Sequence, residues 1–166
     1  MEVAKLQLKW LDPADCHDLA LPTYHSELAS GMDVVAAVAD AQLLEPGEIR
    51  MIPTGFAVAV KPGYELQVRP RSGLAIKHGI TVVNTPGTID ADYRGEVKIG
   101  LINLGREVFT INRGDRIAQL VLAPVCRASI VVTDELDSTE RQAGGFGHTG
   151  VGSRKTEDRR PKSEDE

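Results

Sequence analysis

The sequence has little of what would mark several common classes of protein. Among its 166 residues are only two cysteines, Cys16 and Cys126, and only 4% aromatic residues. The two cysteines lie far apart without metal-ligand spacing, which argues against a disulfide framework and predicts two reduced, semi-buried thiols. No run of 18 apolar residues exists, which argues against a membrane-spanning helix. The start lacks the layout of a signal peptide, so we expect a cytoplasmic protein.

Charge and histidine spacing exclude two further classes. The formal net charge is -5, whereas general nucleic-acid binding needs a basic stripe, so we expect neither a nucleic-acid nor a membrane partner. The four histidines show no zinc-like spacing, and we assign no structural metal. A small anionic ligand remains compatible with an acidic chain, because a few arginines and backbone amides suffice to bind it.

Short runs of alternating apolar and polar residues, separated by turn signals, dominate the sequence. The 16 glycines and 9 prolines fit tight turns between such runs. Period-2 alternation predicts strands at residues 5–10, 56–60, 64–69, 96–103, 119–122 and 130–132. A short helix is expected at 72–77, and residues 36–44 are ambiguous. This spacing favours an all-β barrel or sandwich.

The C-terminal end differs in composition from the rest of the chain. Residues 153–166 hold five basic and five acidic residues and no large apolar side chain. Such a segment buries too little surface to offset its ordering entropy, which predicts a disordered charged tail. We therefore expect a β-barrel domain at 1–140, a glycine-rich lid arm at 141–152 and the tail at 153–166.

The densest polar cluster spans residues 87–96, between two apolar runs that suggest a hairpin with acids at its turn. Its spacing imitates the start of a calcium loop. Arg94 occupies a ligand position, however, and Leu101 stands where the bidentate glutamate would be, so the calcium reading fails. Taken alone, this cluster is compatible with a site or with an ordinary solvated turn.

Two other clusters fit the binding of phosphate groups. Arg71-Ser72-Gly73 directly follows a predicted strand and combines a forked cation, a hydroxyl and an open backbone, although a capped turn explains it equally well. Residues 145–150 match a dinucleotide fingerprint, but no helix can follow in the charged tail, so we reject that reading. A mobile lid carrying Phe146 explains this glycine-rich arm better than a plain linker does.

Two more segments, 29–34 and 113–120, each predict a turn that leads into a strand. Together and in this order, the five segments resemble the five motifs of the trimeric dUTPase family, over about residues 21–150. The resemblance implies an all-β, jelly-roll-like β-barrel subunit that forms a homotrimer with active sites at the subunit interfaces. It also implies hydrolysis of dUTP to dUMP and pyrophosphate with Mg²⁺, which supplies dUMP for dTMP synthesis and keeps uracil out of DNA.

The resemblance also implies roles for individual residues. Asp90 would be the general base that activates the water attacking the α-phosphorus. Tyr93 would pack under the deoxyribose and exclude a 2′-hydroxyl. Three kinds of contact complete the site. The uracil pocket would be formed by Asn84, Thr88, Ile89, Asp90 and, with a weaker assignment, Lys98. The phosphates would be bound from a neighbouring subunit by Arg71, Ser72, Gly73 and Gln119. The closing arm would contribute Arg141, Phe146, Gly147, His148 and Thr149, with Phe146 on the uracil and Arg141 on the γ-phosphate.

The magnesium contact and two departures from the motifs complete the comparison with the family. Asp33 would hold waters around a magnesium ion chelated by the triphosphate. Gln142 and Ala143 depart from the usual glycine-rich fifth motif, and residues 30–34 depart slightly from the first. Two alternatives remain: a dCTP deaminase of the same fold, and a nucleotide-binding interaction module whose trimer matters to a partner.

Overall fold

The computed structural model describes residues 4–145, which are mostly strand and connecting loop. The elements, in chain order, are β1 (Gln7–Trp10), β2 (Met32–Val35), β3 (Gln42–Leu44), β4 (Ile49–Ala59), β5 (Tyr64–Arg69), α1 (Ser72–His78), β6 (Ile80–Val82), β7 (Gly87–Ile89), β8 (Glu96–Asn103), β9 (Phe109–Ile111) and β10 (Arg116–Pro124). The only helix in this part of the chain is α1, at the position predicted for it. No helix there has the length and hydropathy that crossing a bilayer would require.

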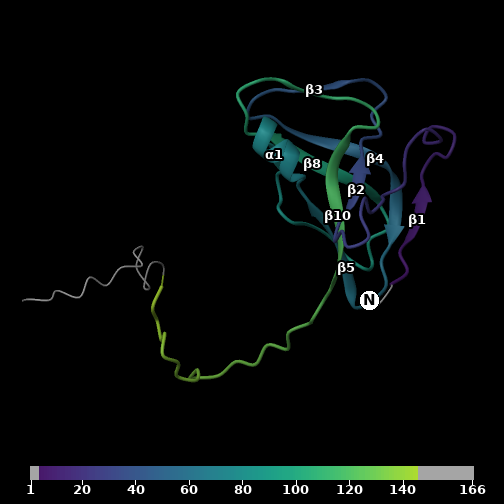
Figure 1. The fold of residues 1–166 in the computed structure, drawn as a ribbon. Coiled ribbons are helices and arrows are strands. Elements are labelled where there is room, and N and C mark those ends of the chain that lie inside the picture. Colours follow the sequence, from purple (N-terminus) through teal and green to yellow (C-terminus); the bar gives the residue numbers. More distant parts are fainter. Residues whose placement is uncertain (1–3, 146–166) are drawn as a thin grey trace, which may run out of the picture. The chain divides into compact units, whose positions relative to one another are not determined.

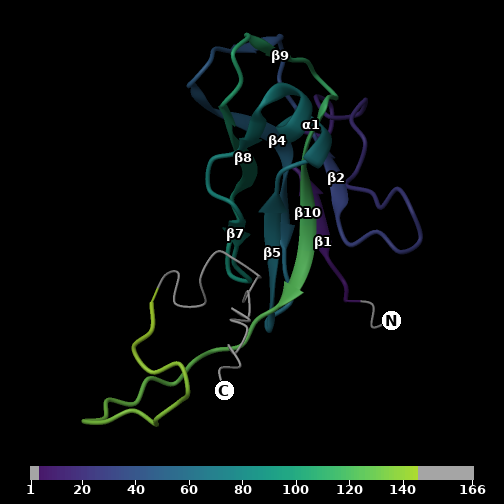
Figure 2. The ribbon, with the colours of Figure 1, turned by 60° about the vertical axis from the view of Figure 1, so that its left-hand side comes forward.

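The strands form two antiparallel four-stranded sheets and one small ribbon. The first sheet has the order β1-β4-β8-β6 and the second the order β2-β10-β5-β7, while β3 pairs with β9. In Figure 1, β1 lies along β4 at the edge of the first sheet. Figure 2 shows the long strand β10 beside β5 in the second sheet. The predicted all-β fold is confirmed.

Alternating side chains from both sheets build one hydrophobic core. On β8, Val97, Ile99 and Leu101 are at most 2% exposed, and on β5 Leu66 is fully buried. Each such side chain stabilises the fold by about 1.5–3 kcal/mol relative to an exposed one. Truncating Leu101 to alanine should therefore cost about 2–5 kcal/mol, because a cavity is added to the lost burial.

The segment between β6 and β8 crosses from one sheet to the other. As predicted, its flanks pair antiparallel, with Val82 opposite Leu101. The connection is not a simple hairpin turn, however, because β7 leaves the first sheet and pairs with β5, Gly87 opposite Val68 and Ile89 opposite Leu66. We call residues 83–95 the crossing segment.

Some local expectations are settled by the structure. The ambiguous stretch 36–44 is not helical and ends in β3. The strand predicted at 130–132 is wrong: Ile130 and Val132 are at least 90% exposed, and no strand of the described chain pairs with them. A single extended segment cannot pair its own backbone N–H and C=O groups, so alternation of side chains alone does not make it a strand. Cys16 is buried as a free thiol, but Cys126 is exposed, so its predicted partial burial is wrong.

The described chain falls into two compact units, one ending at Arg127 and one beginning at Ala128. Both sheets belong to the first unit. The second unit, as far as it is described, has neither helix nor strand. The domain boundary predicted after residue 140 stays a prediction, and residues 146–166 lie outside the described part.

Arg113, in the turn before β10, fixes the loop that follows β1. Its guanidinium donates to both carboxylate oxygens of Asp18 at 2.8 Å and to the carbonyl of Val38 at 3.3 Å. The paired Arg113 lowers the pKa of Asp18 to about 2. Arg113 therefore has a structural role, although it belongs to one of the motif segments.

Candidate active site

The crossing segment contains most of the polar cluster predicted at residues 87–96, which begins with β7. A Cβ atom at Gly87 would lie 3.1 Å from the Cβ of Val68, so glycine allows β7 to approach β5 closely. Asp90 follows β7 directly and is exposed. The side chain of Asn84 lies near Gly87, and its Nδ2 would be 3.3 Å from the same added Cβ atom. The predicted base and the predicted amide thus lie at the two ends of one three-residue strand.

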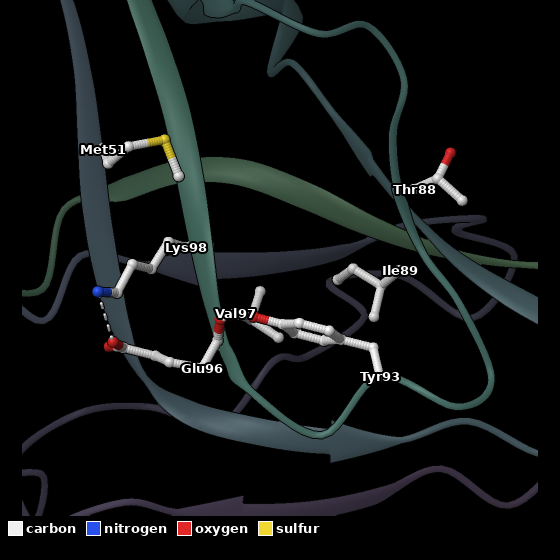
Figure 3. Close-up of a pocket in the computed structure, with 7 residues that line it drawn as sticks. All are labelled: Met51, Thr88, Ile89, Tyr93, Glu96, Val97 and Lys98. Carbon is white, nitrogen blue, oxygen red and sulfur yellow. Dashed lines mark hydrogen bonds and ion pairs between the residues drawn. The ribbon is translucent and has the colours of Figure 1, made fainter.

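A pocket of about 360 Å³ opens between the crossing segment, β4 and β8. In Figure 3 the ring of Tyr93 extends from its loop toward β8, with Ile89 on the adjoining strand. Its lining combines apolar side chains with two charged ones: Met51, Thr88, Ile89, Tyr93, Glu96, Val97 and Lys98. We call this the Tyr93 pocket. Its size and mixed lining suit a small, flat, partly polar ligand.

Two local contacts fix the ring of Tyr93. Its hydroxyl donates to the carbonyl of Glu96 at 2.9 Å. Its ring also packs directly over Gly95, where an added Cβ would lie 2.5 Å from the Tyr93 hydroxyl oxygen. The glycine therefore sets how closely the ring can approach its own backbone, and with it the width of the pocket.

The charged residues of the Tyr93 pocket are paired with each other. Lys98 Nζ lies 3.3 Å from Glu96 Oε2 (Figure 3). Glu96 Oε1 accepts a hydrogen bond from the backbone N–H of Gly55 at 3.2 Å, which anchors that carboxylate to β4. Half of the Lys98 side chain remains exposed, so its ammonium group is within reach of a ligand.

A second pocket, also of about 360 Å³, contains the other predicted polar residues. It lies around the start of α1 and the adjoining ends of β2 and β10. Its lining is mostly polar: His25, Ser26, Ala29, Gly31, Asp33, Arg71, Ser72, Gly73, Arg116 and Gln119. We call this the Asp33 pocket. The space above Gly73 is open, since no atom lies within 4 Å of a Cβ placed there.

The pairing of β2 with β10 places Asp33 and Gln119 together. They are direct partners in the register, and Gln119 Nε2 donates to Asp33 Oδ1 at 3.0 Å. Directly opposed residues on antiparallel strands share a face of the sheet. Strand register thus brings together two residues that are 86 positions apart in the sequence.

Asp33 is the buried acidic centre of this pocket. Its side chain is 6% exposed, and Arg71 Nε lies 3.4 Å from Oδ1 while Arg116 Nη1 lies 3.2 Å from Oδ2. His25 Nε2 lies 3.3 Å from Oδ2. Two guanidinium groups against one carboxylate leave this pocket with net positive charge, which favours an anionic ligand.

Most predicted site residues of the first unit fall into two groups that line different pockets, and Asn84 and Asp90 line neither pocket. Thr88, Ile89, Tyr93 and Lys98 line the Tyr93 pocket, and the two pockets share no lining residue. Arg141 belongs to the second unit, where its Nε donates to the carbonyl of Gly144 at 2.9 Å. The remaining arm residues, Phe146, Gly147, His148 and Thr149, lie outside the described residues.

Sequence reasoning missed several residues that line these pockets. Met51, Glu96 and Val97 line the Tyr93 pocket. Glu96 ends the polar cluster at 87–96 but was given no role there, and no local pattern distinguishes Met51 and Val97 from ordinary strand residues. His25 and Arg116 belong to the Asp33 pocket. The sequence does contain a signal for Arg116. Two consecutive apolar residues, Ile117 and Ala118, separate Arg116 from Gln119, which interrupts the regular alternation of a strand.

Comparison with known proteins identifies the family to which these features correspond. A family profile described as dUTPase matches residues 17–150. A deoxyuridine 5'-triphosphate nucleotidohydrolase of Desulfotalea psychrophila is 64% identical over 147 residues, covering 89% of this chain and 98% of the relative. The same enzyme of a Thermoanaerobacter species is 53% identical over 146 residues, covering 88% and 97%.

Solved structures agree with these relatives. A mutant dUTPase of Staphylococcus bacteriophage 80alpha, described with dUpNHpp, superposes with a TM-score of 0.75 at 28% identity, covering 89% of this chain and 99% of that one. A mutant dUTPase of phage phi11 of S. aureus, described with a structural Mg(II) ion, gives a TM-score of 0.69 at 25% identity, covering 79% and 97%.

Proposed function

The chain belongs to the dUTPase family, and we propose that its two pockets are two parts of one active site for dUTP. As a member of this family, the chain is an enzyme that hydrolyses dUTP to dUMP. The observation that supports a divided site is the separation of the pockets, which share no lining residue. One pocket is partly apolar and flat, whereas the other is polar and positively charged.

The Tyr93 pocket takes the nucleoside. Asn84 and the backbone of 88–90 read the edge of the uracil, with Thr88 and Ile89 on β7 forming one wall and Lys98 the polar end. Tyr93 packs under the deoxyribose. Because two contacts fix its ring, a 2′-hydroxyl finds no space there, and this excludes ribonucleotides.

Asp90 is the general base of the reaction. Its exposed position at the end of β7, next to the nucleoside pocket, gives its carboxylate access to water. The carboxylate takes a proton from a water molecule, whose oxygen bonds to the α-phosphorus. The bond from that phosphorus to the bridging oxygen breaks, and pyrophosphate leaves with the electron pair.

The Asp33 pocket binds the phosphates of dUTP through Arg71, Ser72, Gly73 and Gln119. Guanidinium groups and hydroxyls suit phosphate oxygens, and the open space above Gly73 leaves the backbone accessible. Since the two pockets of one chain are separate, the phosphate pocket of one subunit completes the nucleoside pocket of its neighbour. A homotrimer with three interfacial sites satisfies this arrangement.

Magnesium enters with the triphosphate in this proposal. Within residues 4–145 no group of three or more His, Cys, Asp or Glu side chains could hold a metal ion. Asp33 does not fit a direct ligand, because both its oxygens already contact nitrogen atoms. Its expected contact through water stays a prediction. Bound magnesium would offset the charge that develops on the phosphates.

The C-terminal arm closes over the bound nucleotide. Arg141 reaches the γ-phosphate and Phe146 stacks on the uracil, while residues 147–149, with His148 and Thr149 among them, complete the cover. Closure excludes bulk water and fixes the reacting geometry. The tail after residue 152 takes no part. The predicted cytoplasmic location likewise stays a prediction.

Release of pyrophosphate from dUTP, dCTP, dTTP and UTP, with and without magnesium, tests the site assignment. We expect dUTP alone to be cleaved rapidly. Asp90→Asn should lower kcat by about 10²–10⁴-fold while dUTP still binds, because only proton transfer is lost. Asp92→Asn is the matched control, since Asp92 is exposed on the same segment.

Each contrary outcome has a distinct meaning. An Asp90→Asn variant with wild-type kcat would remove Asp90 from the role of base. Ammonia release from dCTP would favour the deaminase alternative. Binding of dUTP without any cleavage by the wild-type protein would favour a nucleotide-binding interaction module.

A further inference from the structure

A β-bulge in β10 turns Arg116 toward the Asp33 pocket. In the register with β2, Gln119 faces Asp33 and Ala118 faces Val34, but Arg116 faces Val35, so Ile117 is an extra residue. In a regular strand Arg116 and Gln119, three residues apart, would point to opposite faces. The bulge places both on the face of Asp33, and Ile117 and Ala118 together enter the core. Bulges commonly re-aim a side chain in this way beside active sites.

The bulged backbone also orients the neighbouring guanidinium group. Arg71 Nη1 donates to the carbonyl oxygen of Arg116 at 3.1 Å, while Arg71 Nε lies 3.4 Å from Asp33 Oδ1. Arg71 is thus held at both ends of its guanidinium, and its side chain is only 25% exposed. The backbone of Arg116 and the carboxylate of Asp33 together fix the direction in which Arg71 points.

Both oxygens of the Asp33 carboxylate contact neighbouring nitrogen atoms, and each accepts one hydrogen bond. An ionised carboxylate offers about four lone-pair positions. Two nitrogens lie within 3.4 Å of each oxygen: Gln119 Nε2 and Arg71 Nε at Oδ1, and Arg116 Nη1 and His25 Nε2 at Oδ2. All four side chains line the pocket, and Gln119, Arg71 and Arg116 can donate hydrogen bonds to an anion there. Asp33 therefore acts on the ligand through them.

We infer that Arg116 is a further phosphate-binding residue, and that Asp33 is the positioning residue that holds Arg71, Arg116 and Gln119 for the triphosphate. The inference rests on the proposed function of the Asp33 pocket. Arg116 Nη1 lies 3.2 Å from Asp33 Oδ2 and 3.4 Å from His25 Nε2, and half of the Arg116 side chain is exposed. A guanidinium has five donors, so its remaining N–H groups are available for phosphate oxygens.

Binding of two nucleotides by the full-length protein tests the role of Arg116. The α,β-imido analogue of dUTP carries all three phosphates and is not cleaved at the α-phosphorus, whereas dUMP carries only one. We expect Arg116→Gln to lower the affinity for the imido analogue by about 10–100-fold, as for a lost hydrogen bond to a charged group, and to leave the affinity for dUMP unchanged. Arg116→Lys should lose less affinity for the analogue, because a positive charge remains at this position.

Arg106→Gln is the matched control, since it removes one positive charge from an exposed loop residue outside both pockets. Equal affinity of Arg116→Gln and wild type for the imido analogue would overturn the inference. So would an equal loss for dUMP and the analogue together with a lowered melting temperature, which would mean a structural role. Failure of wild-type protein to cleave dUTP would instead overturn the proposed function.

The role of Asp33 is tested by binding in EDTA. A positioning residue holds its partners whether or not metal is bound. Asp33→Asn should therefore lower the affinity for the imido analogue both in EDTA and in magnesium. If Asp33 acts only on the waters of magnesium, Asp33→Asn should match wild type in EDTA and differ only when magnesium is added, and this outcome would overturn its role as the positioning residue.

Discussion

Adding one methyl group at Gly95 should displace the ring of Tyr93 and lower the selectivity for deoxyribose. In Gly95→Ala the new Cβ would lie 2.5 Å from the Tyr93 hydroxyl oxygen and 2.7 Å from Cζ. Carbon atoms normally keep about 3.5–4.0 Å apart, so the ring has to move by about 1 Å. The backbone at Gly95 does not have a positive φ, so alanine itself introduces no backbone strain.

The expected loss of stability is small and the expected loss of selectivity is large. Moving the ring breaks the 2.9 Å hydrogen bond to Glu96, worth about 0.5–1.5 kcal/mol. Tyr93 is 44% exposed, so the ring can turn into solvent without disturbing the core. We expect a melting temperature lowered by about 2–4 °C. A 1 Å misplacement in a site can cost about 10²-fold, so the preference for dUTP over UTP should fall at least about tenfold.

The assay is kcat/KM for dUTP and UTP in four proteins: wild type, Gly95→Ala, Tyr93→Ala and the double variant. Tyr93→Phe serves as a control that removes the hydroxyl and keeps the ring. If Gly95 acts only through Tyr93, the double variant should match Tyr93→Ala, because a shared mechanism is not additive. Unchanged selectivity in Gly95→Ala, or a further loss in the double variant, would refute the reasoning.

Three other predictions concern the rest of the chain. The pKa of Asp18 is lowered to about 2, so its ionised carboxylate stabilises the fold above the ordinary aspartate pKa, and this stabilisation is lost as pH falls from about 4 to 2. The melting temperature of Asp18→Asn should therefore fall less than that of wild type over this pH range. An equal fall in both proteins would mean that the Asp18–Arg113 pair is not a cause of acid sensitivity. Burial raises the pKa of the Cys16 thiol, so a thiol reagent should modify Cys126 rapidly and Cys16 only on unfolding, as peptide mapping would reveal. Ending the chain before Arg141 should reduce pyrophosphate release severely, whereas ending it after residue 152 should not; similar rates for both truncations would discard the closing arm.

Alternation and turn signals predicted the longer strands, but not the three-residue strands β3, β7 and β9. The runs at 64–69 and 96–103 coincide with β5 and β8, because one face of each strand is buried in the core and the other is not. The run at 130–132 has the same local character but no strand beside it. Strand formation depends on a partner, and the local sequence does not specify one.

The sequence by itself also determined the family, since the motif residues and their order identify it. Only the tertiary structure decided which of these residues meet. Asp33 and Gln119 are neighbours through strand register, and Arg116 joins them because a bulge shifts that register by one residue. The period of a strand is two, so a one-residue shift reverses the face to which a side chain points. That shift is a property of two paired strands, and the sequence of either strand alone does not determine it.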